Sequence, residues 1–464
     1  MIDRLKAISL PRLRLLLTLL ALAVGLGIAA AQPALAPSGD GRGYAAYART
    51  LYLTGQYAAT EQGPQADALP GREPLYAALT ALAAHVSPSL AKSLTSCPPP
   101  EEGCVRGYKV LTYLNGIFLG LATGFTLLAL GRLGGGRAAH LVTAGYLILN
   151  LHITKDIRYV LSDFLAMTCL ALAVWLAVRA WQQKTALAWG LAGVGFSLLA
   201  LTKASFFPCA LLLTGWLGLV GLWKLKSEGV KALLPALSLG LVLVAVNGGW
   251  TARNIALFGI SSDDRGAIAI STREVFDHMT PAEHLAAWVW WTRGPGNGLA
   301  KKWFPPEVWS RHEWYDENGF FKLGQEQNPH RREAELQAAH PELSKAQLQP
   351  LLTKAVVGEV LADLPGYIVT MPALFYRGLW CDEFIIVGFP LLILISIRAL
   401  RRRDGGRLVA LLPGWWSLLF YAAISLNIPR YQMTALAALA LATGLFAQDW
   451  LEKKSQNKTE DATA

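Results

Sequence analysis

The sequence has little charge for its length. Only 16% of its 464 residues are Asp, Glu, Lys or Arg, whereas 53% are hydrophobic. A water-soluble chain of this size covers its surface with polar and charged groups, so the composition excludes an ordinary soluble protein. Dinucleotide-binding and P-loop glycine patterns in the strand–helix context that they require are absent too. We therefore expect no soluble nucleotide cofactor.

Cysteine is also scarce, with five residues in the chain. Cys97 and Cys104 lie close together in the stretch SCPPPEEGC. A disulfide between them would fit an oxidising exterior, and free thiols would fit as well. The sequence leaves that pairing open.

Long apolar runs, in contrast, are frequent. Several reach or approach the ~18 residues that cross a bilayer as a helix, and lipid leaves a backbone few other ways to satisfy its hydrogen bonds. The expected fold class is an all-α polytopic membrane protein. The first run could be a signal peptide, but its long apolar core from Leu15 to Ala31 favours a retained anchor. Roughly ten spans are predicted, at residues 14–33, 108–130, 138–153, 160–179, 186–202, 205–223, 233–252, 383–399, 408–426 and 433–450.

Basic residues predict the orientation of these helices. Lys and Arg gather in alternate connections, and such connections face the cytoplasm. We expect a multi-pass protein of a cell inner membrane with both termini in the cytoplasm. The formal net charge of +10 follows mostly from this topology, so no nucleic-acid binding is expected. The residues concerned are Arg4, Lys6, Arg12, Arg14, Arg132, Arg137, Arg179, Lys184, Lys224, Lys226, Lys231, the arginines of 398–407, Lys453 and Lys454.

Four parts follow from this topology. Residues 1–252 form an N-terminal transmembrane module, which includes an external loop at 34–106, called here the first loop. An external α-helical segment at 253–380 is called here the large loop. Residues 381–452 form the C-terminal transmembrane helices, and the polar tail at 453–464 is expected to be disordered.

Both external parts contain helical patterns. In the first loop, tyrosines recur at helical spacing from Tyr44 until Gly55 ends the pattern, and a second juxtamembrane helix is expected around 74–86. In the large loop, residues 341–369 read as a helix that ends in a turn at Pro365 and Gly366.

Ionisable residues recur at the predicted external ends of the spans. Cations are disfavoured on that side of a membrane, so each needs a partner. They could pair with nearby carboxylates or extend to the interface, and as a set they could bind a phosphate at the lipid headgroup level. The cations are Arg72, Lys155, Arg158, Lys203, Arg253 and Arg430, and the acids are Asp40, Glu73, Asp156 and Asp163.

Asp40 stands alone among glycines in the stretch SGDGRGY. Aspartate is a favoured helix N-cap, although Gly43 occupies the position where a capping box would need Glu or Gln. Asp40 is therefore a helix cap, a catalytic carboxylate, or both. The glycines beside it give room for a substrate or simply flexibility.

The order of motifs resembles that of the GT-C glycosyltransferases, closest to the ArnT-like and protein-O-mannosyltransferase-like group, family 39. DGRGYAAYARTLYLTG followed by GREPLYAAL resembles their first external loop, and LSDFLA, LTKAS, WTARNIALFG and NIPRYQ resemble their later elements. The resemblance extends over residues 15–450. Gly41 stands where many relatives have a second acidic residue, Pro74 alone represents their paired prolines, and the large loop offers no element to align.

This resemblance implies a fold and a reaction. The fold is a GT-C-type helical bundle, and the reaction moves a hexosyl or pentosyl group from a polyprenyl-phosphate carrier to an acceptor hydroxyl at the external face. The acceptor would be a lipid, as in lipopolysaccharide, a protein or a cell-envelope polymer. Asp40 would be the general base, and direct displacement with one base predicts inversion. Donor-phosphate ligands would be Lys203, Arg253 and Arg430, with Lys155, Arg158 and Arg72 as further candidates, while Glu73, Asp163 and Tyr76 would hold the sugar or orient the cations.

No cofactor or metal is expected, because the carrier lipid supplies an activated sugar and the histidines of the large loop lack metal-ligand spacing. A divalent cation beside the phosphate stays open. The partners expected are the lipid-linked donor, the acceptor and membrane lipids. The alternative is a transporter or flippase for a lipid-linked sugar, but transporters tend to show internal repeats and midplane polar groups, which are not found here. The sugar, the acceptor and the oligomeric state stay open.

Overall fold

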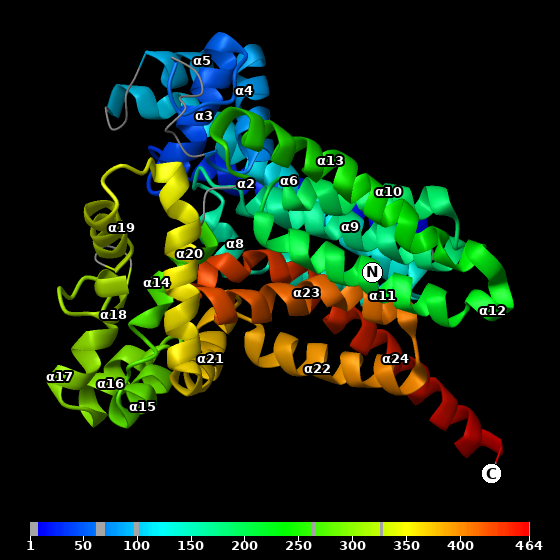
Figure 1. The fold of residues 1–464 in the computed structure, drawn as a ribbon. Helices are drawn as coiled ribbons and strands as arrows, with labels where there is room; N and C mark the ends of the chain where they lie inside the picture. The colour runs from blue at the N-terminus through cyan, green and yellow to red at the C-terminus, as the bar shows by residue number, and fades with distance from the viewer. Residues whose placement is uncertain (1–7, 62–69, 97–101, 262–264, 325–327, 464) are drawn as a thin grey trace.

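The computed structural model describes residues 8–61, 70–96, 102–261, 265–324 and 328–463, and within these ranges every regular element is a helix (Figure 1). The long bundle consists of α2 (Leu10–Ala31), α6 (Lys109–Arg132), α7 (Arg137–Ile148), α8 (Leu151–Asp156), α9 (Asp163–Gln183), α10 (Ala186–Ala200), α11 (Phe207–Trp223), α12 (Leu225–Glu228), α13 (Leu234–Phe258), α22 (Ile385–Arg402), α23 (Gly405–Ile424) and α24 (Leu436–Thr463).

The two loops are helical as well. The first loop contains α3 (Asp40–Thr54), α4 (Pro74–Val86), α5 (Pro88–Thr95) and the 3₁₀-helix η1 (Glu102–Tyr108). The large loop contains α14 (Arg265–Glu274), α15 (Pro281–Trp290), α16 (Gly296–Trp303), α17 (Pro306–Trp309), η4 (Ser310–His312), α18 (Phe320–Lys322), α19 (Asn328–Ala339), α20 (Lys345–Ala362) and α21 (Leu364–Leu379). Two further 3₁₀-helices, η2 (Ala204–Phe206) and η6 (Pro429–Ala435), begin close to the cavity described below.

All ten predicted apolar runs are helical, but fewer of them are long enough to cross a membrane. Within the described residues, seven helices have the required length and composition. Among the others, α7 has 12 residues and α10 has 15, while α22 has 18 but carries Arg398, Arg401 and Arg402. Seven helices are therefore candidate spans by length and composition, against the roughly ten expected from apolar runs, because apolar composition alone does not fix helix length.

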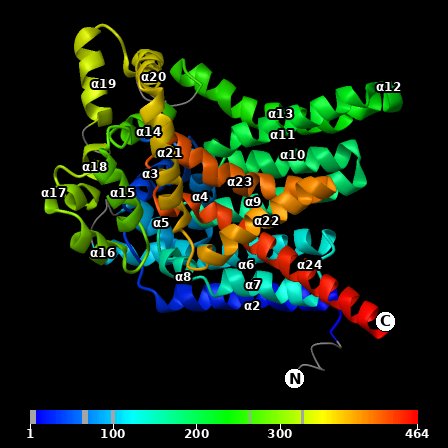
Figure 2. The ribbon, with the colours of Figure 1, turned by 90° about the horizontal axis from the view of Figure 1, so that it is seen from below.

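The loops gather at one end of the bundle. Figure 1 and Figure 2 both place α3–α5 and α14–α20 at that end, and both place α12 and the last turns of α24 toward the opposite end. This arrangement agrees with the predicted separation of the two loops from the basic connections. Which end faces the cytoplasm stays a prediction.

The first helix packs into the bundle through glycine. A Cβ placed on Gly25 of α2 would lie 2.6 Å from the carbonyl oxygen of Gly116 in α6, so the two backbones touch where neither residue has a side chain. Ala21 and Ala29, on the same face of α2, are fully buried. Close backbone contact between small residues is a common way for membrane helices to associate without a hydrophobic driving force.

Three local expectations meet different outcomes. The tyrosine-containing helix α3 ends at Gly55, which has a φ of 72°, as predicted. The predicted turn at Pro365 and Gly366 is wrong, because the helix breaks at Asp363, whose carboxylate accepts a hydrogen bond from the Gly366 N–H and starts α21. Proline in the first turn of a helix is readily accommodated. Cys97 lies outside the described residues, so the disulfide stays untested.

The C-terminal tail is also corrected. Instead of a disordered segment, α24 continues through Thr463. The tail contains neither proline nor glycine, and extending an existing helix is far easier than starting one.

Candidate active site

A cavity of about 750 Å³ lies at the end of the bundle where the loops gather. Its polar lining comes from residues that are distant in sequence but adjacent in the fold. Asp40 begins α3, Asp163 begins α9, and Lys203 directly precedes η2. The ionisable carboxylates and cations of its described lining are Asp40, Arg72, Glu73, Asp163, Lys203 and Arg430.

Five of these side chains, those of Arg72, Asp40, Arg430, Asp163 and Lys203, form one continuous chain of ion pairs. Arg72 Nη2 donates to Asp40 Oδ1 at 2.6 Å, and Arg430 Nη2 donates to Asp40 Oδ2 at 3.1 Å. Arg430 Nε also lies 3.7 Å from Asp163 Oδ2, and Lys203 Nζ donates to Asp163 Oδ1 at 2.6 Å. Charges therefore alternate from Arg72 to Lys203.

The two ends of this chain differ in their exposure to solvent. The side chains of Asp163 and Lys203 keep 9% and 11% of their exposure, whereas that of Asp40 keeps 38%. Burial lowers the pKa of Lys203, but the adjacent Asp163 raises it further, so the net direction is upward and the ammonium stays charged. The buried pair is thus a fixed part of the site, while Asp40 is the carboxylate that a ligand can reach.

Glu73 is the third carboxylate of the lining. Its Oε1 accepts a hydrogen bond from the backbone N–H of Ala204 at 3.1 Å. This contact ties the turn that carries Arg72 to the start of η2, next to Lys203. Glu73 therefore helps to hold two cation-bearing segments together.

Aromatic side chains complete the polar wall. Tyr44 lies under the Arg72 guanidinium, 5.2 Å from it, and Lys203 Nζ lies 5.9 Å from the Tyr421 ring. The Tyr44 hydroxyl is 3.1 Å from Ser162 Oγ, and burial raises the pKa of Tyr44, which keeps it a neutral hydroxyl. Tyr421 and Tyr431 were not singled out from the sequence, although the position of Tyr431 directly after Arg430 is a signal that could have indicated it.

The large loop supplies part of the cavity wall. Gly266, Ile268, Ala269 and Thr272 of α14 line it, together with residues of α23 such as Phe420. These lining residues are largely apolar, in contrast to the ion-paired residues of the lining. Sequence reasoning missed α14, since its short apolar pattern carries no recognisable motif.

Arg253, one of the predicted phosphate ligands, is not among the residues that line the cavity. Its guanidinium donates to the Tyr57 carbonyl oxygen and to Asn254 Oδ1, and it lies 4.6 Å from the Trp250 ring. Tyr57 in turn donates its hydroxyl to the Arg72 carbonyl oxygen at 2.7 Å. Arg253 therefore contacts the first loop from outside the cavity lining. Its predicted contact with the donor phosphate stays an untested prediction.

Lys155, Arg158 and Tyr76 also lie outside the cavity lining. Lys155 is exposed, and Arg158 stacks over the Tyr159 ring at 5.3 Å. Tyr76 is buried with its ring 5.1 Å from that of Tyr44, in an edge-on arrangement. Its place is behind the wall of the cavity.

The structure also bears on whether Asp40 is the N-cap of α3. The N-cap residue of α3 is Gly39, and Asp40 is the first helical residue, so the expectation that Asp40 caps the helix is wrong. A Cβ on Gly39 would meet nothing within 4 Å, but Gly41 and Gly43 do not leave open room. A Cβ on Gly41 would lie 2.5 Å from the Val160 carbonyl oxygen, and one on Gly43 would lie 2.6 Å from Arg72 Nε. These glycines let Arg72 and the Val160 loop approach α3 closely.

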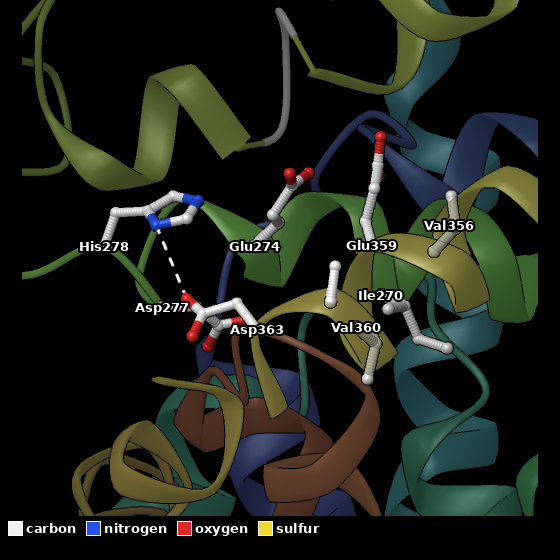
Figure 3. Close-up of a pocket in the computed structure, with 9 residues that line it drawn as sticks. Ile270, Glu274, Asp277, His278, Val356, Glu359, Val360 and Asp363 are labelled. Atoms are coloured by element: carbon white, nitrogen blue, oxygen red, sulfur yellow. Dashed lines mark ion pairs between the residues drawn. The ribbon is translucent and has the colours of Figure 1, made fainter. Parts of the chain in front are cut away.

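A second hollow, of about 250 Å³, lies within the large loop (Figure 3). Glu274, Asp277, Glu359 and Asp363 surround it, and each has a basic partner. Arg332 contacts both glutamates, Arg273 lies 3.4 Å from Asp277, and His278 lies 3.7 Å from Asp363. Burial raises the pKa of Asp277 to about 6.

These pairs join α14, α19, α20 and the start of α21, so we interpret this hollow as structural. No group of three or more His, Cys, Asp or Glu side chains in the described ranges is arranged to hold a metal.

Comparison with known proteins gives matches in structure only. No protein-family model and no curated protein sequence matches the chain. The archaeal oligosaccharyltransferase AglB from Archaeoglobus fulgidus, in complex with an inhibitory peptide and a dolichol-phosphate, aligns with 96% of this chain at a TM-score of 0.50 and 12% identity. The chain spans 52% of that protein, about half its length.

Two further structures match less well. An Archaeoglobus fulgidus oligosaccharyltransferase tethered with an acceptor peptide aligns with 94% of this chain, at a TM-score of 0.47 and 12% identity. The alignment covers 49% of the oligosaccharyltransferase chain. ArnT from Cupriavidus metallidurans bound to undecaprenyl phosphate aligns with 92% of this chain. The alignment covers 77% of the ArnT chain, at a TM-score of 0.36 and 16% identity.

AglB is a GT-C membrane enzyme, and the alignment with it extends over almost the whole chain. At 12% identity the match shows the fold alone. The reaction therefore has to be inferred from the residues of the site. The predicted architecture is confirmed: this all-α membrane protein has the GT-C-type fold.

Proposed function

We propose that the protein is an integral-membrane glycosyltransferase that moves a sugar from a polyprenyl-phosphate carrier to an acceptor hydroxyl at the external membrane face. The observation that carries this proposal is the ion-pair chain at the cavity, in which the reachable carboxylate of Asp40 contacts two guanidinium groups, and one of these, Arg430, also lies beside the buried Asp163–Lys203 pair. A carboxylate can accept the proton of the acceptor hydroxyl, and the cations can bind the phosphate of the donor.

In the proposed reaction Asp40 is the general base. It accepts the proton of the acceptor hydroxyl as that oxygen attacks the anomeric carbon of the sugar. The bond between the anomeric carbon and the phosphate oxygen breaks, and its electron pair stays on the phosphate. The products are the glycoside and the polyprenyl phosphate, and the attack from the opposite face inverts the anomeric carbon.

The cations serve the leaving group. Negative charge develops on the lipid phosphate as its bond to the sugar breaks, and preorganised guanidinium groups stabilise such charge. Arg430 and Arg72 are the accessible candidates, and Lys203 supports Arg430 through Asp163. A pentosyl or hexosyl group fits this chemistry equally well.

The contacts of Asp40 suggest an order of binding. Both of its oxygens accept hydrogen bonds from guanidinium groups, so an acceptor hydroxyl has to compete for them. A donor phosphate would attract Arg72 and Arg430 and release Asp40. We therefore expect the donor to bind before the acceptor is deprotonated.

The test uses purified full-length protein, labelled polyprenyl-phosphate sugars and membrane acceptors. Replacing Asp40 with Asn is expected to lower transfer by at least about 100-fold, because the base is lost. Binding of polyprenyl phosphate should be retained or tighter, since Asp40 no longer competes for Arg72 and Arg430.

The matched control is Glu228→Gln, which removes a carboxylate from an exposed pair in the basic connection at Lys224. It should leave transfer unchanged. Near-full transfer by Asp40→Asn would show that Asp40 is not the base. If the wild type consumes no carrier-linked sugar but moves it across proteoliposome membranes, the transporter reading replaces the enzyme.

A further inference from the structure

The segment Ser425–Pro429 places Arg430 at the cavity. It connects the end of α23 to η6, and Arg430 is the second residue of η6. Apart from the ion pairs of its own side chain, the position of Arg430 therefore depends on what fixes this short segment.

Asn427 lies at the centre of the segment and is fully buried. Its φ of 44° is in the left-handed region, which asparagine tolerates better than most residues. Its backbone N–H donates to Ser425 Oγ at 3.1 Å. The residue thus closes a tight bend directly before Arg430.

The side chain of Asn427 reaches the large loop. Its Nδ2 donates to the carbonyl oxygen of Leu374 in α21 at 2.9 Å. A Cβ on the neighbouring Gly378 would lie 2.2 Å from that same Nδ2, so α21 approaches Asn427 at a point without a side chain. Arg377 of α21 adds a hydrogen bond from Nη1 to the Leu426 carbonyl oxygen at 3.1 Å.

The other side of Asn427 is joined to the bundle. Its Oδ1 accepts a hydrogen bond from Gln432 Nε2 at 2.7 Å, and Gln432 Oε1 accepts one from Ser417 Oγ of α23 at 3.0 Å. Gln432 and Ser417 are fully buried. A buried network in which every amide atom of Asn427 has a partner fixes geometry, because any displacement leaves a polar group unsatisfied.

We propose that Asn427 is a positioning residue for Arg430, fixing the guanidinium between Asp40 and Asp163 by joining α21 of the large loop to α23 and η6. Asn427 does not line the cavity and acts only through Arg430. The proposal rests on the proposed function only in giving Arg430 a donor phosphate to bind.

A double-mutant cycle on the full-length protein tests the proposal, with undecaprenyl phosphate as the probe. Asn427→Gly keeps the backbone conformation available and removes both side-chain contacts. It is expected to weaken binding by about tenfold, the effect of one misplaced charged contact. In an Arg430→Gln background, Asn427→Gly should cause no further loss, because it acts through the residue already removed.

Hydrogen exchange of residues 425–431 gives a second readout that needs no ligand. Asn427→Gly should speed exchange in this segment. Asn247, in α13, provides the control, because its Nδ2 donates to Ser197 Oγ at 3.1 Å in a similarly buried place. Asn247→Asp and Asn427→Asp form a matched pair, and only the second should alter the segment and the binding.

The outcomes separate the two proposals. If the wild type does not bind undecaprenyl phosphate, the proposed function fails, and the exchange data still decide on Asn427. Unchanged exchange at 425–431, or losses from Asn427→Gly and Arg430→Gln that simply add, would overturn the positioning role.

Discussion

At the scale of single residues, Lys203 and Asp163 are the pair most withdrawn from water at the cavity. Their ion pair is 2.6 Å long, and a buried charge without its partner is costly. Each therefore depends on the other, although the pair as a whole need not stabilise the fold relative to an apolar pair of the same shape.

This dependence gives a prediction on stability. Lys203→Met should destabilise the protein by about 3–5 kcal/mol, because Asp163 is left buried and unpaired. Adding Asp163→Asn should restore most of the loss, since the unpaired charge is removed. Thermal unfolding in detergent, followed by intrinsic fluorescence, measures both effects.

The control for this prediction is Lys224→Met. Lys224 pairs with Glu228 at 3.0 Å, but the two side chains are 40% and 53% exposed. Exposed pairs of this kind contribute about 0–1 kcal/mol, so little change is expected. Equal losses from Lys203→Met and Lys224→Met would contradict the burial argument.

Single residues also show how far the sequence could predict the site. Asp40, Lys203 and Arg430 were found because they stand at the ends of apolar runs, where an ionisable side chain is conspicuous. Arg253 stands at such an end as well, yet its guanidinium packs against Trp250 and the first loop. Sequence position fixes the depth of a residue along a helix, but not the direction in which its side chain points.

At the scale of elements, the large loop is held together by charge as well as by apolar packing. Arg332 of α19 contacts Glu274 of α14 and Glu359 of α20 at the edge of the second hollow. Its side chain is 8% exposed, so this one cation links three helices in a partly buried place.

The corresponding prediction compares two adjacent arginines. Arg332→Gln should loosen α19 and speed its hydrogen exchange at least about tenfold, since breaking a buried ionic contact is strongly destabilising. Arg331→Gln should have little effect, because Arg331 pairs with Glu335 at 3.7 Å and both side chains are more than 60% exposed. Similar exchange in the two variants would refute the linking role of Arg332.

The elements themselves were predictable to different degrees. Long apolar runs and the tyrosine pattern ended by Gly55 gave α2, α3, α6 and α9 directly, since these depend on local composition. The break at Asp363 and the contribution of α14 to the cavity depend on contacts between distant segments. Such contacts leave no periodic trace in the sequence.

At the scale of the whole molecule, the cavity exists only when the helices are assembled. Its ionisable residues come from the first loop, from the starts of α9 and η2 and from η6. Any change that separates the N-terminal helices should therefore disturb both stability and the site.

The contact between Gly25 and Gly116 allows such a change to be made outside the lining of the cavity. Gly25→Val should lower the thermal unfolding midpoint and reduce transfer, because its side chain would collide with the α6 backbone. Gly27→Val is the matched control on the same helix, since a Cβ there meets nothing within 4 Å. An unfolding midpoint that falls equally in both variants would show that valine, not the collision, is responsible.

The ion-pair chain has a consequence for biogenesis. Before the C-terminal helices are synthesised, the described part of the cavity lining contains Asp40, Glu73 and Asp163 as carboxylates and Arg72 and Lys203 as cations, a formal charge of −1 from these five groups. Arg430 arrives with η6 and brings the sum of these six groups to zero. Among these groups, the last part of the chain to be made thus carries the charge that the earlier parts lack, so we expect electrostatic attraction to favour the docking of the C-terminal helices.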